Sequence, residues 1–427
     1  MKVKVGNSET SSYRKGFIPF IRFYASQIHE GGWPILLRKA RSFLKMLLLM
    51  PLMTVVLILY ALRPLVLIRF GQLRSERIGH FAANTEVYLC KRDAGLDNQR
   101  AFDIFYHRAP ACNQQLKKMW DRTLHVSRIA RPMYFLNRNL PGGASHVIPW
   151  PEYGSRDIRG LLPRSPVHLS FTPEEERIGN EGLQALGIPE GTPFICFHSR
   201  DREYLSALFP DRISHGHDYR DSSIHNHIPA AEEMTRRGYF AIRMGAVVKE
   251  TLATTNPMII DYATNFRSDF MDIYLCAKCH FYIGDDAGLN LVPFIFRRPV
   301  AYVNQIPIQT VHTWGPDHLS IPKKLWLRKE HRFLTLREIF DWEVDDFRRT
   351  QQFEQAGIEP VENTPEEITA LAMEMDERLK GTWQTTEEDE ELQRRFWSLF
   401  RAHEDRHGII VSRIGAEFLR QNQEFLD

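Results

Sequence analysis

Short apolar segments alternate with helical segments between residues 193 and 304, and this alternation constrains the fold more than any other feature. The apolar segments are rich in β-branched and aromatic residues, and the segments between them have the apolar spacing of amphipathic helices. Strands are expected at 193–198, 239–244, 258–262, 281–284 and 299–304, and helices at 229–237, 269–279 and 287–296. Because this order is typical of βαβ units, it predicts an α/β fold built on a parallel sheet.

A shorter alternation of the same kind precedes this region. It predicts strands at 65–70 and 102–107 and helices at 81–90 and 113–124. A further helix should begin at Thr172, because a threonine cap followed by Pro173 and Glu175 is a helix-start signal. We therefore expect two α/β domains, at 65–190 and 191–345, between a basic and apolar segment at 1–64 and acidic helices at 346–427 that pack back on the domains.

The composition excludes several classes of protein. A formal charge of +2 over 427 residues argues against a general nucleic-acid binder. Five cysteines in a chain of this length exclude a disulfide-stapled scaffold. The hydrophobic content of 43% is enough to build real cores, so a disordered chain is excluded as well.

Residues 46–62 form an uncharged, strongly apolar run that suggests contact with a membrane. The run is slightly shorter than the roughly 20 residues that span a bilayer. It is flanked by basic residues on both sides, and residues 1–80 hold thirteen Lys and Arg against three Asp and Glu. A basic end beside an apolar run favours attachment to a surface of anionic lipid. A single membrane span and a buried core helix are the alternatives.

Polar residues follow the predicted strand at 193–198. In open parallel sheets, ligands bind beyond the carboxyl ends of the strands. Arg200 can offer a planar fork to phosphate oxygens, and Asp201 or His198 can accept a proton. The alternative is a surface cluster of salt bridges.

A histidine-rich segment comes next, with His215, His217, His225 and His227. Two His-x-His pairs without a cysteine or a Glu-x-x-His helix match no strong zinc pattern, so no metal site is predicted. The segment reads best as a polar active-site loop that also carries Asp218 and Arg220. A metal site and a plain solvated loop remain the alternatives.

Two further strand ends carry candidate ligand-binding residues. Arg243 lies inside an apolar strand, where a cation needs an anionic partner such as phosphate or a carboxylate, and Gly245 ends that strand. Asp261 and Tyr262 end the next strand and could hold a ribose and a base.

The segment 281–289 reads as a strand, a sharp turn and the start of a helix. The free N–H groups of such a helix start suit a diphosphate. Asp285 or Asp286 is expected to cap the helix and organise the loop, while the backbone around Ala287 and Gly288 contacts phosphate. An ordinary capped helix is the alternative.

These strand-end residues, in this order, resemble bacterial glycosyltransferases of the GT-B architecture from surface-polysaccharide gene clusters. The matching segments are RIGHFAANTEVYLC (77–90), FHSRDREYL (197–205), HDYRDSSIHNHIPAAEEMTRRGYFAIRMG (217–245), IIDYA (259–263) and RSDFMDIYLCAKCHFYIGDDAGL (267–289), together with the 299–304 strand. IGDDAGL is distantly similar to a turn of lipopolysaccharide heptosyltransferases, and HSRD to the His-x-Arg motif of several fucosyltransferases. Ala287 departs from the heptosyltransferase pattern, because it offers no hydroxyl to a phosphate.

The resemblance implies two Rossmann-like domains that face a cleft, with a nucleotide sugar bound mainly by the C-terminal domain. His80 would face the cleft from the N-terminal domain and contact the acceptor. The residues implied for substrate binding are His80, Arg200, Arg220, Arg243, Gly245, Asp261, Tyr262, Arg267, Asp269, Asp285, Asp286, Ala287, Gly288 and Leu289. Asp201 is the first candidate for the general base, followed by His198 and Asp218.

The predicted function is transfer of a hexosyl or deoxyhexosyl group from a nucleotide sugar to a lipid-linked or surface-polysaccharide acceptor. No cofactor and no metal are expected, because Arg200, Arg243 and the helix start can stabilise the leaving group. The expected location is the cytoplasmic face of the inner membrane, in contact with its lipid surface and not with nucleic acid. The alternatives are a nucleotide-sugar epimerase or hydrolase, and a non-catalytic membrane-surface scaffold with a degenerate nucleotide pocket.

Overall fold

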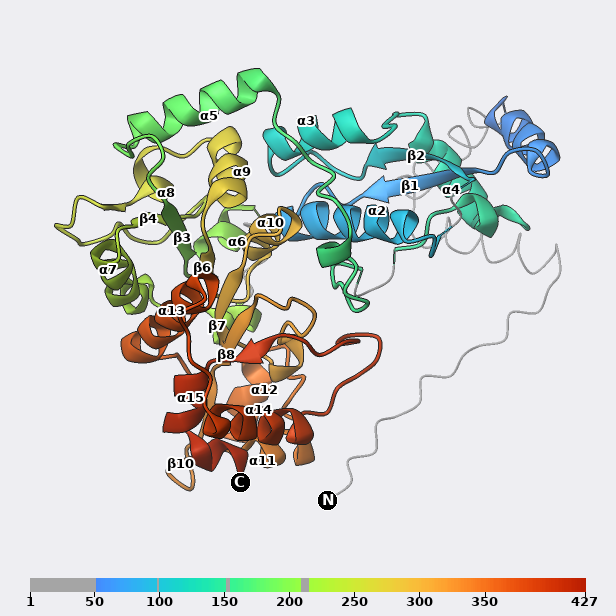
Figure 1. Ribbon diagram of the computed structural model, residues 1–427. Helices are drawn as coiled ribbons and strands as arrows, with labels where there is room; N and C mark the ends of the chain where they lie inside the picture. Colours follow the sequence, from blue (N-terminus) through green and yellow to red (C-terminus); the bar gives the residue numbers. More distant parts are fainter. Residues whose placement is uncertain (1–50, 98–99, 151–153, 209–214) are drawn as a thin grey trace, which may run out of the picture.

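The computed structural model describes residues 51–97, 100–150, 154–208 and 215–427 (Figure 1). Two parallel sheets and a small antiparallel sheet organise this part of the chain. The predicted α/β class with a mainly parallel sheet is confirmed.

The larger parallel sheet has the strand order β12-β8-β7-β6-β3-β4-β5, and every neighbouring pair in it is parallel. Its strands are β3 (Phe194–His198), β4 (Phe240–Arg243), β5 (Ile259–Ile260), β6 (Tyr282–Gly284), β7 (Val300–Gln305), β8 (Leu319–Pro322) and β12 (Arg413–Ile414). The chain fills the sheet from β3 outward to β5, returns to β6 beside β3, and then continues outward to the other side. The boundary between β3 and β6 is therefore the topological switch point, where open α/β sheets bind their ligands.

Helices cover both faces of this sheet (Figure 1). They are α6 (Glu203–Leu208), α7 (Ile228–Arg236), α8 (Tyr262–Asn265), α9 (Asp269–Lys278), α10 (Leu291–Ile295) and α13 (Pro365–Lys380). The acidic C-terminal region packs back as expected, because Asp376 of α13 accepts hydrogen bonds from Arg237 (2.9 Å) and from the Tyr239 hydroxyl (2.7 Å).

The second parallel sheet is small. It pairs β1 (Ile68–Leu73) with β2 (Phe102–His107), and single bridges add Val147 beside β1 and Val126 beside β2. The π-helix η1 (His80–Asn84) leads into α2 (Thr85–Asp93), and α3 (Gln114–Thr123) and α4 (Ala130–Asn139) complete this part. The strand at 102–107 has the predicted limits, whereas β1 begins three residues later than expected.

One hydrophobic core joins the two parallel sheets. It contains Phe81 and Trp120 from the N-terminal part together with Phe194 and Tyr282 from the larger sheet and Trp314 from the segment between β7 and β8. The helix α5 (Pro173–Ala185), which the domain prediction assigns to the N-terminal domain, hydrogen-bonds to α9: the Tyr274 hydroxyl lies 3.1 Å from a Glu176 carboxylate oxygen. The proposed boundary near residue 190 is thus crossed by continuous packing.

The region after residue 304 contains strands that the sequence patterns do not predict. An antiparallel sheet has the order β10-β9-β11, formed by β9 (Lys324–Leu327), β10 (Arg332–Phe333) and β11 (Ile358–Val361). The remaining helices are α11 (Leu336–Asp341), α12 (Thr350–Ala356), α14 (Glu387–Leu399) and α15 (Ala416–Gln421).

The apolar run at 46–62 is described only from residue 51, and residues 51–62 are helical. Val56 and Leu59 of this helix are buried against α4, in a small core that includes Met133 and Tyr134. None of the helices in the described ranges combines the length and the apolar character needed to cross a bilayer.

Candidate active-site cleft

A cleft of about 440 Å³ lies at the carboxyl ends of β3 and β6, between the larger sheet and the loop that precedes η1. This is the topological switch point of the sheet. Its wall contains residues 77–80 and Cys112 from the N-terminal part, and His198, Ser199, Arg200, Asp201, Tyr204, His217, Arg220, Gly245, Ala246, Val247, Arg267, Asp272, Asp286, Ala287, Gly288, Leu289, Leu291 and His312 from the rest of the chain.

Two glycines bring the two sides of the cleft into backbone contact. A Cβ placed on Gly79 would lie 2.8 Å from the Gly288 Cα and 2.9 Å from its carbonyl oxygen. Real Cβ atoms do not approach other atoms so closely, so only glycine fits at this point. The contact fixes the loop before η1 directly against the turn after β6.

The turn after β6 presents free backbone donors to the cleft. Within the described part of the chain, the N–H groups of Ala287, Gly288 and Leu289 have no hydrogen-bond acceptor. All three residues line the cleft. Consecutive unpaired N–H groups on a turn bind anionic oxygens.

The helix expected at 287–296 differs from the prediction. It begins as a 3₁₀ turn at Gly288–Asn290 and continues as the five-residue α10. Ala287 occupies the cap position, and no side chain caps the turn. An anion at this turn would therefore be held by the local N–H groups and not by the dipole of a long helix.

Arg200 and Arg220 face this turn. Arg200 bonds to the carbonyl oxygen of His217 (3.1 Å) and to the carboxylate of Asp221. Arg220 donates to Asp286 Oδ2 (2.8 Å), while its Nε has no partner among the described residues. Burial raises the pKa of Asp221 to about 6 despite the facing Arg200. Both arginines already hold a carboxylate here, so an anionic ligand would compete with Asp221 and Asp286 for them.

Asp285, one of the two residues predicted to cap the turn, does not cap it, and neither does Asp286. The Asp285 carboxylate has another role. It is fully buried and accepts hydrogen bonds from the Arg200 backbone N–H (2.7 Å), from Asn304 Nδ2 (2.9 Å) and from the Ser222 hydroxyl. Burial alone would raise its pKa, but the facing His227 ring at 3.6 Å and the hydrogen bonds from Ser222 and Asn304 outweigh burial and lower the pKa to about 2. The carboxylate thus ties three loops together beneath the cleft and does not face a ligand.

The three candidates for the general base lie in different settings. Asp201 uses both oxygens locally, accepting 3.0 Å bonds from the backbone N–H groups of Glu203 and Lys249. Burial lowers the pKa of His198 to about 4, which makes its ring a weak base. Asp218 faces Arg202 at 3.6 Å and lines a neighbouring hollow of about 390 Å³, not the cleft.

His80 is better placed for proton transfer than these three. It begins η1, lines the cleft, and its Nδ1 lies 3.1 Å from Asn84 Oδ1. An amide oxygen only accepts hydrogen bonds, so Nδ1 carries the proton and Nε2 keeps its lone pair. Burial, with Arg74 and Arg77 nearby, lowers the pKa of His80, so the ring is neutral at neutral pH.

The strand ends at Arg243 and Asp261 form an internal pair. Arg243 Nη1 lies 3.3 Å from Asp261 Oδ2, so the expected anionic partner of this buried cation is a carboxylate of the same chain. Tyr262 is fully buried, and its hydroxyl bonds to Ser268 O and Asp272 Oδ1, both at 2.9 Å. The prediction that Tyr262 contacts a nucleoside is therefore wrong, because the tyrosine ring points into the core.

Arg267 and Asp269 form an ion pair in the structure, with Arg267 Nη2 3.0 Å from Asp269 Oδ1. Arg267 lines the cleft and bonds to Asp272 (2.9 Å), whose pKa burial raises to about 6. Through its other oxygen, Asp269 also accepts a bond from the Gln114 backbone N–H (2.8 Å) and so links α9 to α3. Gly245 and Leu289 line the cleft. Arg77, Tyr204, His217 and Asp272 also line it, although the strand-end rule could not select them because none of them follows a strand directly.

The histidine-rich segment does not form a cluster. His217 lines the cleft, His225 lies 3.6 Å from Glu250, and His227 is buried 3.6 Å from Asp285. Three different surroundings for three described histidines do not provide a shared metal site.

One group of metal-type donors exists elsewhere in the described residues, formed by Glu86, Cys90 and His168. His168 already holds Glu86 (3.0 Å) and Asp93 (2.8 Å), and Arg297 lies 2.7 Å from Glu86. Two cations therefore balance two carboxylates, so the group needs no metal ion for charge balance.

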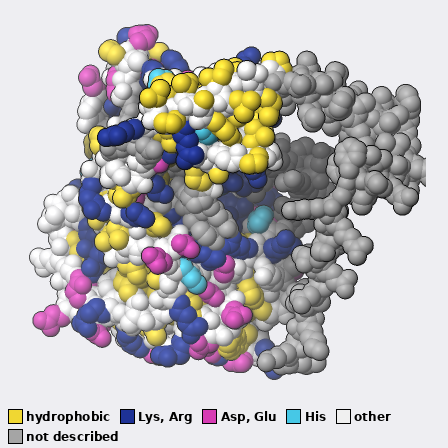
Figure 2. All heavy atoms as spheres, turned by 90° about the vertical axis from the view of Figure 1, so that its right-hand side faces the viewer, with side chains coloured by type: hydrophobic (Ala, Val, Ile, Leu, Met, Phe, Trp, Pro, Cys, Tyr) yellow, Lys and Arg dark blue, Asp and Glu magenta, His cyan; other side chains and the backbone are white. Residues whose placement is uncertain are grey.

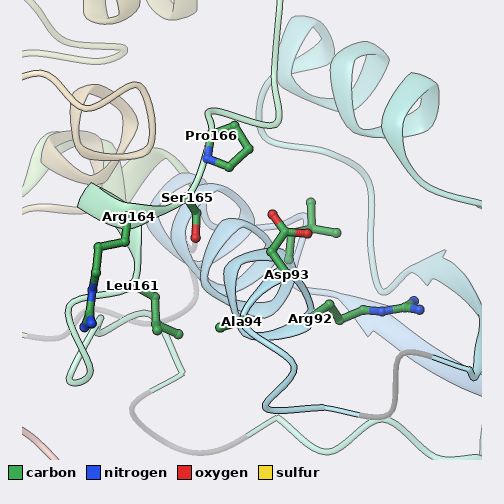
Figure 3. A pocket seen from close by; sticks show the side chains of 8 residues that line it. Arg92, Asp93, Ala94, Leu161, Arg164, Ser165 and Pro166 are labelled. Carbon is green, nitrogen blue, oxygen red and sulfur yellow. The ribbon is translucent and has the colours of Figure 1, made fainter.

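A wide hollow of about 970 Å³ lies beside this group, between the end of α2 and residues 161–166 (Figure 3). Arg92 and Arg164 extend away from it to opposite sides in Figure 3. Arg92 bonds to Asp103 (2.7 Å), and Arg164 to the carbonyl oxygen of Gly160 (2.8 Å). Neither arginine therefore points into this hollow.

No family model and no curated protein matches the sequence. Solved structures similar to this chain include a family 9 glycosyl transferase from Veillonella parvula DSM 2008, with 10% identity and a TM-score of 0.41 over 73% of this chain and 96% of that one. The E. coli ADP-heptose lipopolysaccharide heptosyltransferase II matches with 14% identity and a TM-score of 0.37 over 59% of this chain and 90% of its own. The iron-containing dodecameric glycosyltransferase TibC from enterotoxigenic E. coli H10407 matches with 11% identity and a TM-score of 0.33, over 57% of this chain and 59% of TibC.

The distant similarity to heptosyltransferases that the sequence implied is thus found among solved structures. TM-scores of this size do not identify a function, which has to come from the residues of the cleft.

Proposed function

We propose that this chain is a glycosyltransferase that moves a sugar from a nucleoside-diphosphate sugar to the hydroxyl group of a glycan acceptor. The donor class is hexosyl or deoxyhexosyl, and the acceptor is a lipid-linked or nascent surface polysaccharide at the cytoplasmic face of the inner membrane. The two parallel sheets on either side of the cleft correspond to the two halves of a GT-B enzyme.

The observation that carries this proposal is the anion site at the switch point. Residues 287–289, whose three N–H groups have no acceptor among the described residues, line the same cleft as Arg200 and Arg220. A diphosphate offers several acceptor oxygens with two or more negative charges, which this set of donors matches.

Glycosyl transfer needs a stabilised leaving group. The acceptor oxygen forms a bond to the anomeric carbon while the bond from that carbon to the diphosphate oxygen breaks, so the diphosphate leaves with an additional negative charge. Arg200, Arg220 and residues 287–289 line one cleft, and in this proposal their donors stabilise the charge on the leaving diphosphate. They supply the stabilisation that a divalent cation provides in other enzymes, so we propose that the reaction needs no metal.

The acceptor hydroxyl must also lose a proton, and we assign this step to His80 Nε2. Asn84 fixes the ring as the Nδ1–H tautomer, and the contact between Gly79 and Gly288 holds His80 next to the anion site. The ring takes the proton as the new glycosidic bond forms, and the electron pair of the broken bond leaves with the diphosphate.

The test is a turnover assay with the full-length chain in detergent. Each donor, a GDP, UDP, ADP, CMP or dTDP sugar, carries a radiolabel in its sugar and is incubated with the chain and a lipid extract from the source membrane. The expected result is one donor that yields labelled lipid and free nucleotide in equal amounts, with or without EDTA.

The other outcomes separate the alternatives. Isomerised sugar nucleotide without acceptor would identify an epimerase, and free sugar in place of labelled lipid would identify a hydrolase. Absence of turnover with every donor, together with no binding of any donor, would overturn the proposal in favour of a non-catalytic scaffold.

A further inference from the structure

We infer that the helix at 51–62 and the outer face of α4 form a surface that docks on an anionic lipid bilayer. This surface, called the lipid-docking surface below, comprises Val55, Leu57, Ile58, Leu62, Leu65, Val66, Ile129 and Phe135, with Arg63, Arg128, Arg131 and Arg138. The inference does not depend on the proposed enzymatic activity.

The helix at 51–62 is apolar on both sides. Val56 and Leu59 face the small core shared with α4, where they are 0% and 8% exposed. On the other side, Leu57 is 63% exposed and Ile58 is 52% exposed, and Leu65 just beyond the helix is 84% exposed. A helix that is apolar all round is expected inside a core or in a membrane. The exposed side of the helix at 51–62 therefore lacks the apolar environment that such a helix requires.

The outer side of the helix at 51–62 lies beside α4, because the two helices pack on the same small core. Ala130, Met133 and Tyr134 of α4 pack with Val56 and Leu59. On the surface of α4, Ile129 is 55% exposed and Phe135 is 46% exposed. Figure 2 shows hydrophobic side chains gathered over the upper part of this face of the molecule. Gathered apolar surface of this kind marks a site of contact with a partner or a membrane.

The charges around this surface favour anionic lipid over a protein partner. Arg63, Arg128, Arg131 and Arg138 are exposed, and no ion pair involves them within the described residues. The segments 51–68 and 123–150 contain no Asp or Glu. Arginine side chains at the rim of an apolar surface can lie at the headgroup level while the apolar side chains enter the acyl boundary.

The sequence immediately before this helix has the same character. Residues 46–50 continue the uncharged apolar run, and Arg38, Lys39, Arg41 and Lys45 precede it. Basic clusters near the lipid surface strengthen binding to anionic headgroups additively. A second copy of this chain, in contrast, would bring the same four arginines against each other in a symmetric contact.

The test is flotation of the full-length chain with vesicles, one set of phosphatidylcholine alone and one set mixed with phosphatidylglycerol. We expect at least roughly tenfold more protein to float with the mixed vesicles, and the difference to shrink in high salt. The double variant Leu57→Ser/Leu65→Ser should lose flotation with both sets. The triple variant Arg128→Gln/Arg131→Gln/Arg138→Gln should lose only the preference for the anionic set.

The matched control is Ile178→Ser/Trp342→Ser, which removes apolar side chains that are 40% and 46% exposed elsewhere on the molecule and should float like the wild type. Melting curves establish that each variant is folded. Unchanged flotation of the Leu57/Leu65 variant would overturn the inference, because it would place membrane contact elsewhere in the chain. A dimer in light scattering that this variant dissociates would also overturn it, in favour of a second copy.

Discussion

His80 enters the cleft as a ring whose reactive nitrogen is selected by its neighbour. Asn84 lies one helical turn further on, and its amide oxygen accepts from Nδ1 at 3.1 Å. A neutral histidine has two tautomers, and only one of them has its lone pair on the nitrogen that faces the substrate. The contact with Asn84 selects that tautomer. Asn84 is therefore a positioning residue, and its effect on rate should pass through His80.

The pH dependence of turnover tests this assignment. Because the ring must be neutral to accept a proton, and its pKa lies below the ordinary 6.5, kcat should rise with pH through an acid limb below pH 6.5 and then stay level. His80→Gln should lower kcat by about 10²–10⁴-fold and abolish the acid limb. The donor dissociation constant should stay unchanged, as measured by calorimetry.

His125→Gln provides the control, because His125 is an exposed histidine outside the cleft. A variant of His80 that keeps wild-type kcat and the same acid limb would show that another group takes the proton.

Single residues also show where reasoning from the sequence stops. The position of a residue at a strand end predicted that Arg200, Gly288 and Leu289 reach one cleft, and they do. Strand position does not fix the direction of a side chain, so Tyr262 was expected in the cleft although it lies in the core. Either Asp285 or Asp286 was expected to cap the helix, but neither does, and the partners of the buried Asp285 come from residues 222 and 304, which are distant in sequence.

Among the secondary-structure elements, those with strong local signals were predictable. The limits of β2 agree with the prediction, and α5 begins with the full capping box between Thr172 and Glu175. The two-residue strands β10 and β12 were missed, because such short segments exist only through pairing with β9 and β8. Tertiary contacts decide segments of this length, and the sequence window alone does not reveal them.

The link between α2 and the segment before α5 depends on a charged histidine. Burial alone would lower the pKa of His168, but interactions with Cys90, Glu86 and Asp93 outweigh burial and raise the pKa to about 10. The folded pKa lies above the ordinary 6.5, so this contribution to stability is complete below pH 6.5. It declines as the pH rises and is lost above about pH 10.

Chemical denaturation at several pH values tests this link. His168→Gln should lower the free energy of unfolding by about 1–2 kcal/mol at pH 6 and by much less at pH 10, since partial solvent screening reduces the full linkage value. An equal loss at both pH values would contradict a charged His168, because it would reflect lost packing and not a lost ion pair.

The two parallel sheets are joined by packing as well as by the chain. One apolar core contains side chains from both, and Gly79 meets Gly288 across the cleft. The anion site and the proposed base therefore face each other at a distance that two glycines set. This arrangement could not be predicted from the sequence, because nothing local to either glycine indicates its partner.

Gly79→Ala tests the importance of this contact. The added methyl group would lie 2.8 Å from the Gly288 Cα, so the two backbones must separate. We expect a loss of about 1–3 kcal/mol in the free energy of unfolding and a several-fold weaker binding of the donor. Gly216→Ala is the control, because a Cβ there meets nothing within 4 Å. Wild-type stability and donor binding in Gly79→Ala would contradict a tight contact.

The anion site at the switch point must hold the donor before any chemistry follows, so it can be tested by the binding of nucleoside diphosphates alone. Isothermal titration of the full-length chain with GDP, UDP, ADP and dTDP, in EDTA, should reveal one that binds. Arg220→Gln should weaken that binding by roughly 10–100-fold, the range for loss of a hydrogen bond from a charged group. Arg202→Gln, whose arginine lies outside the cleft, should bind like the wild type. No binding of any nucleotide, or equal binding by Arg220→Gln and the wild type, would contradict the donor site described above.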